Sequence, residues 1–506
     1  MRLVDLAHPA NRGSAEQAFR TAAEALKAAS GVAQRAYLRT VEVLRAGATH
    51  LQLPLGPLTA GLVVRLVLAP FAAWNYDDAV WFHTALSGYY GVPLYQRPGF
   101  SYPPVWGYLL QILGTVIHAS GFGPSFFGVV DHNFAPAASV TSDYTDVVTA
   151  PGFNLLFKVA LFAFDLLTAA VIYRFVNQLT GKPKRARLAF MAWFLNPFVI
   201  YESAIHGAFD VIVGFAVLAT LILILIGREY WAGAAWAIGI LTKLSPVTLG
   251  LELVLAIAVM ENSIQQSTRF TVRRLAGFGL GAGVAMGCLV APLVLQGSVQ
   301  AMLHNVFARA QTPITIGGIS ISGLRYLKPF SGLLVWAFEN SGTVIQATTT
   351  AQIVAIVLWA IWTVIMVRKD PVFGLFTGSI GTLASFMLLS PIANPQYILW
   401  WLPALTVFVF ASGRGYWPFA VISLAPVFFS LAILGPTASL APVATYTHLI
   451  PASVVNNEVI AWYTAPPRLW GATLADDVFA PASLATVAAI ISLFVVWIRL
   501  AREEFW

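Results

Sequence analysis

Charged residues and cysteine are scarce in this chain. Asp, Glu, Lys and Arg make up 10% of its 506 residues, and Cys288 is the single cysteine. Soluble globular domains carry about 25% charged residues, so the composition excludes an ordinary soluble protein. A lone cysteine has no partner for an intrachain disulfide, which excludes a disulfide-stabilised secreted domain. Because 58% of the residues are hydrophobic, a disordered chain is excluded as well.

Long apolar runs take the place of the missing charges. A membrane crossing needs about 20 predominantly apolar residues, and the sequence holds about 12 such stretches, so we expect 11 to 13 transmembrane helices. The fold class predicted is therefore an all-α polytopic membrane protein. The stretches cover residues 57–74, 152–176, 187–201, 208–226, 231–243, 246–260, 275–296, 345–367, 372–390, 396–411, 415–434 and 482–500.

Basic residues are spread unevenly over the connections between these stretches. Cytoplasmic loops of membrane proteins carry an excess of Lys and Arg, so the short basic connections are predicted to be cytoplasmic. The net charge of +7 is then a topology signal, and no nucleic-acid partner is expected. The residues concerned are Lys182, Lys184, Arg185, Arg187, Arg228, Arg269, Arg273, Arg274, Arg368, Lys369, Arg414, Arg499 and Arg502.

The same rule sets the domain boundaries. Residues 1–50 lack the apolar core of a signal peptide and are predicted to form cytoplasmic amphipathic helices that contact membrane lipids. Counting the 16-residue stretch 104–119 as a crossing would place the later basic loops outside. We therefore predict one long external loop, 75–151, with helices along the membrane surface. The remaining divisions are a transmembrane core at 51–434, external loops at 297–344 and 435–481, and a last transmembrane helix with its cytoplasmic tail at 482–506.

Two adjacent aspartates stand directly after the first apolar stretch, in the string Trp74-Asn75-Tyr76-Asp77-Asp78. Aspartates at a helix start often cap free backbone N–H groups and lie favourably at the positive end of the helix dipole. A carboxylate at the membrane boundary is also partly desolvated and suited to act as a general base. Both interpretations remain open for Asp77 and Asp78 at this point.

Other polar groups fall on the same predicted face. His206 and Asp210 stand at the start of the stretch 208–226, Lys243 occupies a turn before Pro246, and Asn394-Pro395-Gln396-Tyr397 forms another turn. Each of these has an ordinary structural explanation, since Asn-Pro and Ser-Pro mark turns. The distribution of basic loops places all of these residues on one face of the membrane. Together they predict a site at the external membrane surface.

Five strings occur in an order that is known from one family. They are the segment from Asn75 to Tyr102, then FNLLFKVALFAFDLLTAAVIYRF, NPF…HGAFD, LTKLSPVT and NPQYILWWLP. In this order they resemble the first mannosyltransferase of GPI-anchor synthesis. More broadly they resemble the GT-C glycosyltransferases, integral membrane enzymes that use polyprenyl-phosphate or dolichyl-phosphate sugars. The resemblance covers roughly residues 57–411.

The resemblance implies a GT-C-type fold and an inverting transfer. The catalytic base of such enzymes, an acidic residue of the first external loop, falls on Asp77, and Asp78 is the alternative. The family pattern Asp-x-Asp reads Asn75-Tyr76-Asp77 here, which disfavours a bound divalent metal. We therefore expect no cofactor.

A departing lipid phosphate needs cations or N–H donors that face its charge. Arg325 and Lys328 are the first candidates, with Arg97 behind them, although snorkelling of basic side chains at the membrane surface explains each equally well. Lys243 is expected either to face the charge of the departing phosphate as well, or to pair with Glu252 or Asp210. The remaining candidates would bind the sugar or line the donor cavity. The complete set of candidate substrate-binding residues is Arg97, Tyr102, His206, Asp210, Lys243, Arg325, Lys328, Gln396 and Tyr397.

Charged residues inside the apolar stretches need partners within the bundle. Lys158 and Asp165 are seven residues apart, which places both on one face of a helix, and we expect them to form an internal ion pair. Arg65 is expected to pair with a carboxylate inside the bundle, but the sequence names no partner for it.

The function expected is transfer of mannose from a polyprenyl-phosphate donor to a hydroxyl of a lipid-linked or glycan acceptor. The scarcity of cysteine and the lack of Asn-x-Ser/Thr sites in the external loops favour the external face of a bacterial cytoplasmic membrane. The alternatives are another sugar, such as arabinose or glucose, and a protein acceptor. A transporter is the alternative outside enzymes, but no repeat relates the two halves, and the polar clusters are not at the midplane.

Overall fold

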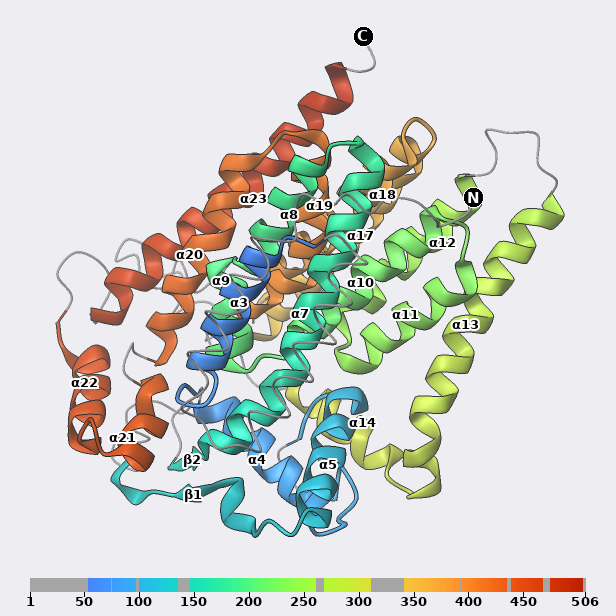
Figure 1. Ribbon diagram of the computed structural model, residues 1–506. Coiled ribbons are helices and arrows are strands. Elements are labelled where there is room, and N and C mark those ends of the chain that lie inside the picture. The colour runs from blue at the N-terminus through green and yellow to red at the C-terminus, as the bar shows by residue number, and fades with distance from the viewer. Residues whose placement is uncertain are drawn as a thin grey trace, which may run out of the picture.

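The computed structural model describes residues 53–73, 75–96, 100–134, 146–260, 268–310, 341–390, 394–434, 438–466 and 474–503. Within these ranges the chain is a bundle of long helices with one small two-stranded sheet (Figure 1). The predicted amphipathic helices of residues 1–50 lie outside the described ranges.

Within the described residues, each predicted apolar stretch contains a helix. Six helical segments of the described chain are long and apolar enough to cross a membrane, and five shorter apolar helices accompany them. The prediction of an all-α polytopic membrane protein is confirmed. The α-helices that occupy the predicted stretches are α3 (Leu55–Leu68), α7 (Pro151–Thr180), α8 (Pro183–Phe194), α9 (Pro197–Ile200), α10 (Asp210–Leu225), α11 (Glu229–Thr242), α12 (Gly250–Val259), α13 (Thr268–Leu295), α17 (Ser341–Val367), α18 (Pro371–Leu389), α19 (Leu402–Ser412), α20 (Tyr416–Leu434) and α23 (Leu474–Glu503), of which α8 and α9 belong to one membrane-length segment.

Proline and caps set several helix boundaries. α7, α8 and α18 each begin with proline, whose fixed φ suits the first helical position and whose missing N–H would have no intrahelical partner there. The side chain of Asp370 caps α18 by accepting from the N–H groups of Val372 at 2.9 Å and Phe373 at 3.0 Å. α7 ends at Gly181, whose φ of 63° lies in the left-handed region.

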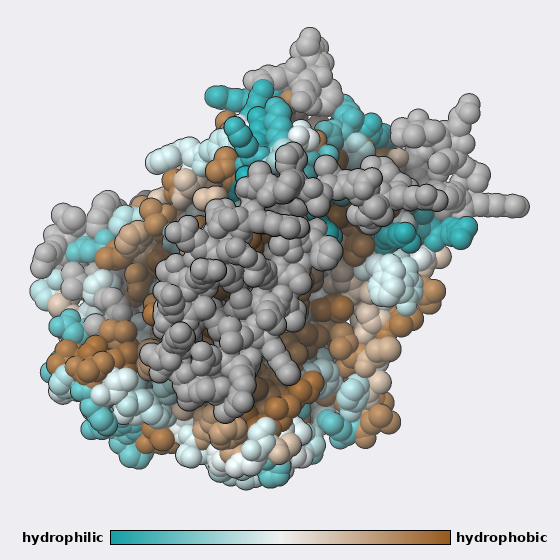
Figure 2. Space-filling view, in the orientation of Figure 1, coloured by the Kyte–Doolittle hydropathy of each residue, from teal (hydrophilic) through white to brown (hydrophobic). Residues whose placement is uncertain are grey.

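One end of the bundle carries a group of shorter elements, at the bottom of Figure 1; we refer to it as the site end. Its elements come from the predicted external loops. They are α4 (Asn75–Tyr89), α5 (Pro104–Ala119), β1 (Gly128–Val130), β2 (Val147–Thr149), α14 (Val299–Ala310), α21 (Ala441–Thr447) and α22 (Ala452–Thr464). The opposite end carries the α7–α8 connection and the end of α23. Figure 2 shows hydrophilic residues gathered at this opposite end and apolar residues on the flanks of the bundle.

The stretch 104–119, which we predicted to be a surface helix rather than a crossing, forms α5 and packs against α4. Their backbones meet directly at two glycines. A Cβ added to Gly88 would lie 2.3 Å from the carbonyl oxygen of Gln111, and one added to Gly114 would lie 1.9 Å from that of Ala85. Only glycine permits this approach, so α4 is held firmly against α5.

Two predicted external loops pack on each other, which the sequence did not predict. β1 pairs with β2 in antiparallel register, with Gly128 opposite Thr149. The hydroxyl of Tyr446 in α21 donates to the carbonyl of Val148 at 3.3 Å. Beneath these contacts lies a small apolar core that joins the first loop to the third; it consists of Phe134, Val148, Ala441, Ala444, Val455 and Val459.

The expected ion pair between Lys158 and Asp165 is wrong. Arg65 of α3 reaches Asp165 instead, with Nε 3.0 Å from Oδ2, and also donates to the carbonyl of Phe194 at 2.8 Å. Seven residues of helix separate Lys158 from Asp165 by about 10 Å along the axis, which is too far for an ion pair. The guanidinium of Arg65, on α3, lies at the level of Asp165. Lys158 donates to two backbone carbonyls, those of Ala72 at 2.6 Å and Ile205 at 3.0 Å.

The topology can be tested with two isosteric cysteine substitutions in a Cys288→Ala background. Ser125 lies exposed at the site end, and Ser412 lies exposed at the opposite end, where α19 ends. If the basic connections face the cytoplasm, a membrane-impermeant maleimide applied to intact cells should label Ser125→Cys and spare Ser412→Cys. The reverse labelling pattern would overturn the predicted orientation.

Candidate active site

Asp77 lies in the first turn of α4 with 7% of its surface exposed. Its Oδ2 atom is 2.9 Å from Nε2 of His206, a residue 129 positions later in the chain. The two residues therefore come from different parts of the fold. α4 brings the carboxylate from the surface region, and the segment after α8 and α9 brings the imidazole from the bundle.

His206 ends a π-helical turn, η4 (Tyr201–His206). Asn196 starts the segment by accepting from the N–H of Phe198 at 3.0 Å. The turn stops at Gly207, whose φ of 74° is left-handed and whose added Cβ would lie 2.7 Å from the Phe157 ring and 3.1 Å from Oδ1 of Asp78. Only glycine suits this position. π-helical turns are rare and occur frequently at functional sites.

Glu202 completes a line of three side chains. Its Oε2 atom lies 2.5 Å from Nδ1 of His206, and its Oε1 atom accepts from the hydroxyl of Ser430 at 2.9 Å. Glu202 is fully buried, whereas His206 is 1% exposed. Neither Glu202 nor Ser430 is among the candidate residues named from the sequence. The spacing of four between Glu202 and His206 was the available signal, because such residues meet on one helix face.

Asp78 has a different environment from Asp77. It is buried, lies close to Gly207, and interacts electrostatically with the Lys158 ammonium. The same ammonium holds the carbonyls of Ala72 and Ile205. Lys158 thus ties the segment before α4 to the end of η4, and Asp78 is part of this support.

A second polar group surrounds Lys243, the residue that follows α11. Nζ of Lys243 donates to Oδ1 of Asp210 at 2.7 Å, and Nε1 of Trp400 donates to the same oxygen at 2.5 Å. Four rings face the ammonium at 4.3 to 5.9 Å from their centroids, a favourable cation–π arrangement. We refer to these four rings, Tyr102, Phe209, Tyr397 and Trp400, as the aromatic box.

The contacts around His206 and those around Lys243 adjoin the same aromatic side chains. His206 and Asp210 belong to the same short segment, and Phe209 lies between them in the chain. Trp81, one turn after Asp77 on α4, packs edge-on against Phe209 with ring centroids 5.5 Å apart. Asp77 and Lys243 therefore lie on two sides of a common aromatic cluster.

Most of the candidate substrate-binding residues lie in or near these two groups of contacts. The side chain of Lys243 is 13% exposed, Gln396 is buried in η7 (Pro395–Trp400), and Tyr397 stacks on Trp400 with centroids 4.3 Å apart. Burial raises the pKa of the Tyr95 hydroxyl, which stays protonated and donates to the Tyr102 carbonyl at 2.7 Å. Arg97, Arg325 and Lys328 lie outside the described residues.

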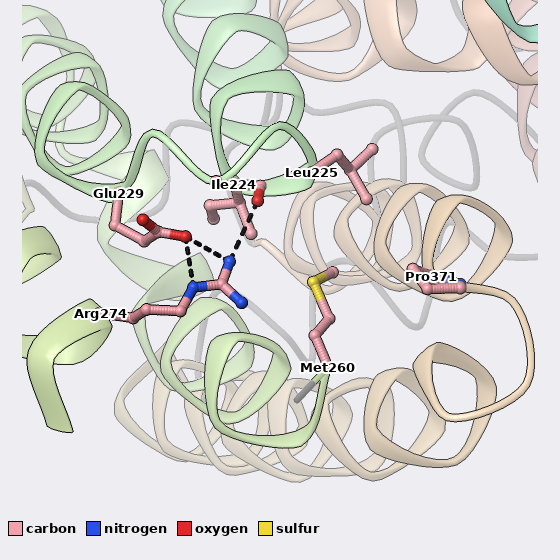
Figure 3. Close-up of a pocket in the computed structure, with 7 residues that line it drawn as sticks. Ile224, Leu225, Glu229, Met260, Arg274 and Pro371 are labelled. Carbon is pink, nitrogen blue, oxygen red and sulfur yellow. Dashed lines mark hydrogen bonds and ion pairs between the residues drawn. The ribbon is translucent and has the colours of Figure 1, made fainter. Parts of the chain in front are cut away.

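A hollow of about 320 Å³ lies near the opposite end of the bundle (Figure 3). An ion pair between Glu229 of α11 and Arg274 of α13 crosses it, as the dashed lines in Figure 3 show. α10 begins at Asp210 in the candidate site and reaches this hollow at Leu225, a rise of about 22 Å. The hollow is therefore separate from the Asp77 site.

No group of three or more His, Cys, Asp or Glu side chains suited to hold a metal ion occurs among the described residues. Glu202, His206 and Asp77 do not converge on one point, because both ring nitrogens of His206 are engaged by carboxylates. Metal-independent chemistry stays a prediction.

Part of the chain matches a known protein family. Residues 147–391 match the family described as glycosyltransferase family 87, which is of the GT-C type. The matched region includes His206, Asp210 and Lys243, whereas Asp77 precedes it. A comparison with curated proteins finds no match.

The match bears out the resemblance to GT-C glycosyltransferases and gives no support to the more specific resemblance to the GPI mannosyltransferase. The helices that are long and apolar enough to span a membrane agree with it. The chain is a multi-pass membrane glycosyltransferase, with a region, residues 147–391, that is similar to glycosyltransferase family 87.

Proposed function

We propose that the chain transfers mannose from a polyprenyl-phosphate donor to a hydroxyl of a lipid-linked or glycan acceptor. The reaction takes place at the site end, on the outside of a bacterial cytoplasmic membrane. The observation that carries the proposal is the contact between Asp77 and His206, because it fixes a carboxylate at the start of a surface helix. The choice of mannose rests on the sequence resemblance alone.

Asp77 is the proposed general base in a single inverting displacement. The proton of the acceptor hydroxyl passes to Oδ1 of Asp77 as the hydroxyl oxygen attacks the anomeric carbon. The bond from that carbon to the phosphate oxygen breaks on the opposite face, and the phosphate leaves with the electron pair. Because His206 engages Oδ2, Oδ1 is the oxygen assigned to the acceptor. Asp78 is not assigned this role, since it interacts with Lys158.

Lys243 is the proposed cation for the donor phosphate. Asp210 and the aromatic box hold its ammonium in place while part of its side chain remains accessible. A preoriented cation stabilises the negative charge that develops on the departing phosphate. Tyr102, Gln396 and Tyr397 are proposed to line the same donor pocket, and Arg97, Arg325 and Lys328 remain candidates for the phosphate. A transporter is not proposed, because the family match supports a glycosyltransferase.

Replacement of the proposed base tests the function directly. Asp77→Asn should lower the transfer rate by at least about 100-fold, since a general base typically contributes 10² to 10⁴, while purified protein still binds the donor. Asp146→Asn is the matched control, because Asp146 lies at the same end and its side chain is 36% exposed. Transfer of radiolabelled mannose to membrane lipids would be measured. Undiminished activity of Asp77→Asn would remove Asp77 from the mechanism.

The role of Lys243 predicts a defect in donor use. Removing only the lysine would leave Asp210 buried without its cation, so the double variant Lys243→Met/Asp210→Asn keeps the pair neutral. The KM for the donor should rise by at least about tenfold, whereas the exposed Lys184→Met at the opposite end should leave it unchanged. An unaltered donor KM in a folded double variant would contradict the phosphate assignment.

Metal independence gives another test. Because Asn75 replaces the first acid of the family pattern, transfer should continue at its full rate after treatment with EDTA. Activity that is lost on chelation and returns with Mg²⁺ or Mn²⁺ would show that a metal takes part.

A further inference from the structure

We propose that Glu202 is a positioning residue for the transfer, and that Glu202, His206 and Asp77 take up and release the acceptor proton as one unit. This rests on the proposed function, in which Asp77 is the base. Glu202 itself does not reach the substrate, because it is fully buried behind His206.

The number of protons in the line follows from its contacts. Both gaps, Oε2 to Nδ1 at 2.5 Å and Nε2 to Oδ2 at 2.9 Å, are hydrogen-bond distances. A neutral imidazole has one N–H, so its other nitrogen would direct a lone pair at a carboxylate oxygen, which is repulsive. The line therefore holds a second proton, one in each gap. Before the transfer, His206 is an imidazolium between two carboxylates.

Donors from the surrounding bundle hold Glu202 in place within η4. Oε1 of Glu202 accepts from Ser430, and the N–H of Ala208 donates to the backbone carbonyl of Glu202 at 2.8 Å. The other carboxylates nearby have their own cations, and His206 is the ion-pair partner of Glu202. The charged groups packed around η4 are Asp77 and Asp78 from α4, Lys158 and Asp165 from α7, Arg65 from α3, and the pair of Asp210 with Lys243.

A proton shift within the line accompanies the transfer. When the acceptor proton binds Oδ1 of Asp77, the imidazolium loses its negative neighbour. The Nδ1–H bond then breaks and an Oε2–H bond forms on Glu202, which leaves three neutral groups. After the product leaves, Asp77 releases its proton to water and Glu202 returns its proton to Nδ1. No other reactant is needed.

The variant Glu202→Gln separates charge from packing. Its amide can donate to Nδ1 of a neutral imidazole, so Nε2–H still faces Asp77, but it cannot take up a proton. Without the imidazolium, Asp77 loses a cation and binds protons more readily. The acid limb of the kcat profile should therefore move to higher pH. At the pH optimum, kcat should fall by about 10- to 100-fold, the usual effect of losing such a supporting partner, with the donor KM within about twofold.

Glu252→Gln is the matched control. Glu252 is also a fully buried glutamate, and it accepts from Ser379 and Thr382 on α18. Its replacement should leave the kcat profile in place. If Glu202→Gln gives the wild-type profile while Asp77→Asn is inactive, the positioning proposal falls and the proposed function stands. If Asp77→Asn transfers at the wild-type rate, Asp77 is not the base, and the proposed mechanism itself falls.

A measurement on the wild-type protein covers the case in which Glu202→Gln does not fold. The rate constant of a single turnover would be recorded over a series of D₂O fractions. Two protons that move together give a curved dependence, whereas one proton gives a straight line. A straight line would overturn the coupled proton shift.

Discussion

The ammonium of Lys158 is the interaction on which the rest of the site depends. It binds the carbonyl oxygens of Ala72 and Ile205 and lies near Asp78. Ala72 belongs to the segment that leads into α4, and Ile205 directly precedes His206. Because a buried ammonium without such acceptors is costly, the two segments are held together. The contact between Asp77 and His206, and through it the place of Glu202, follows from this junction.

Charge inside the bundle is arranged in compensated groups. Arg65 with Asp165 and Lys243 with Asp210 combine opposite charges, and His206 bridges the carboxylates of Asp77 and Glu202 by hydrogen bonds. Pairs of this kind add little net stability over apolar packing, but loss of one partner leaves an uncompensated charge and costs about 3 to 5 kcal/mol. Such pairs fix relative positions of helices, which suits a site assembled from several of them.

The sequence predicted the helices well because a membrane imposes long apolar runs that few other structures share. It also collected Asp77, His206, Asp210 and Lys243 near one end of the bundle, from the distribution of basic loops. The sequence did not predict which buried polar side chains contact one another. Whether Asp165 meets Lys158 or Arg65 depends on how α3 crosses α7, and the contact of Ser430 with Glu202 depends on the rotation of α20. Neither crossing nor rotation is encoded in the spacing of residues along one helix.

The π-helical turn at η4 makes the site sensitive to the length of the chain. A π-turn holds one residue more than the α-helix around it. Deletion of one residue between Glu202 and His206 would allow the turn to close as regular α-helix, with the two residues three positions apart in place of four. The 2.5 Å contact between Nδ1 of His206 and Oε2 of Glu202 depends on that spacing. A membrane helix of identical hydropathy, shorter by that one residue, would still span the bilayer, but Glu202 and His206 would have to meet at a different spacing.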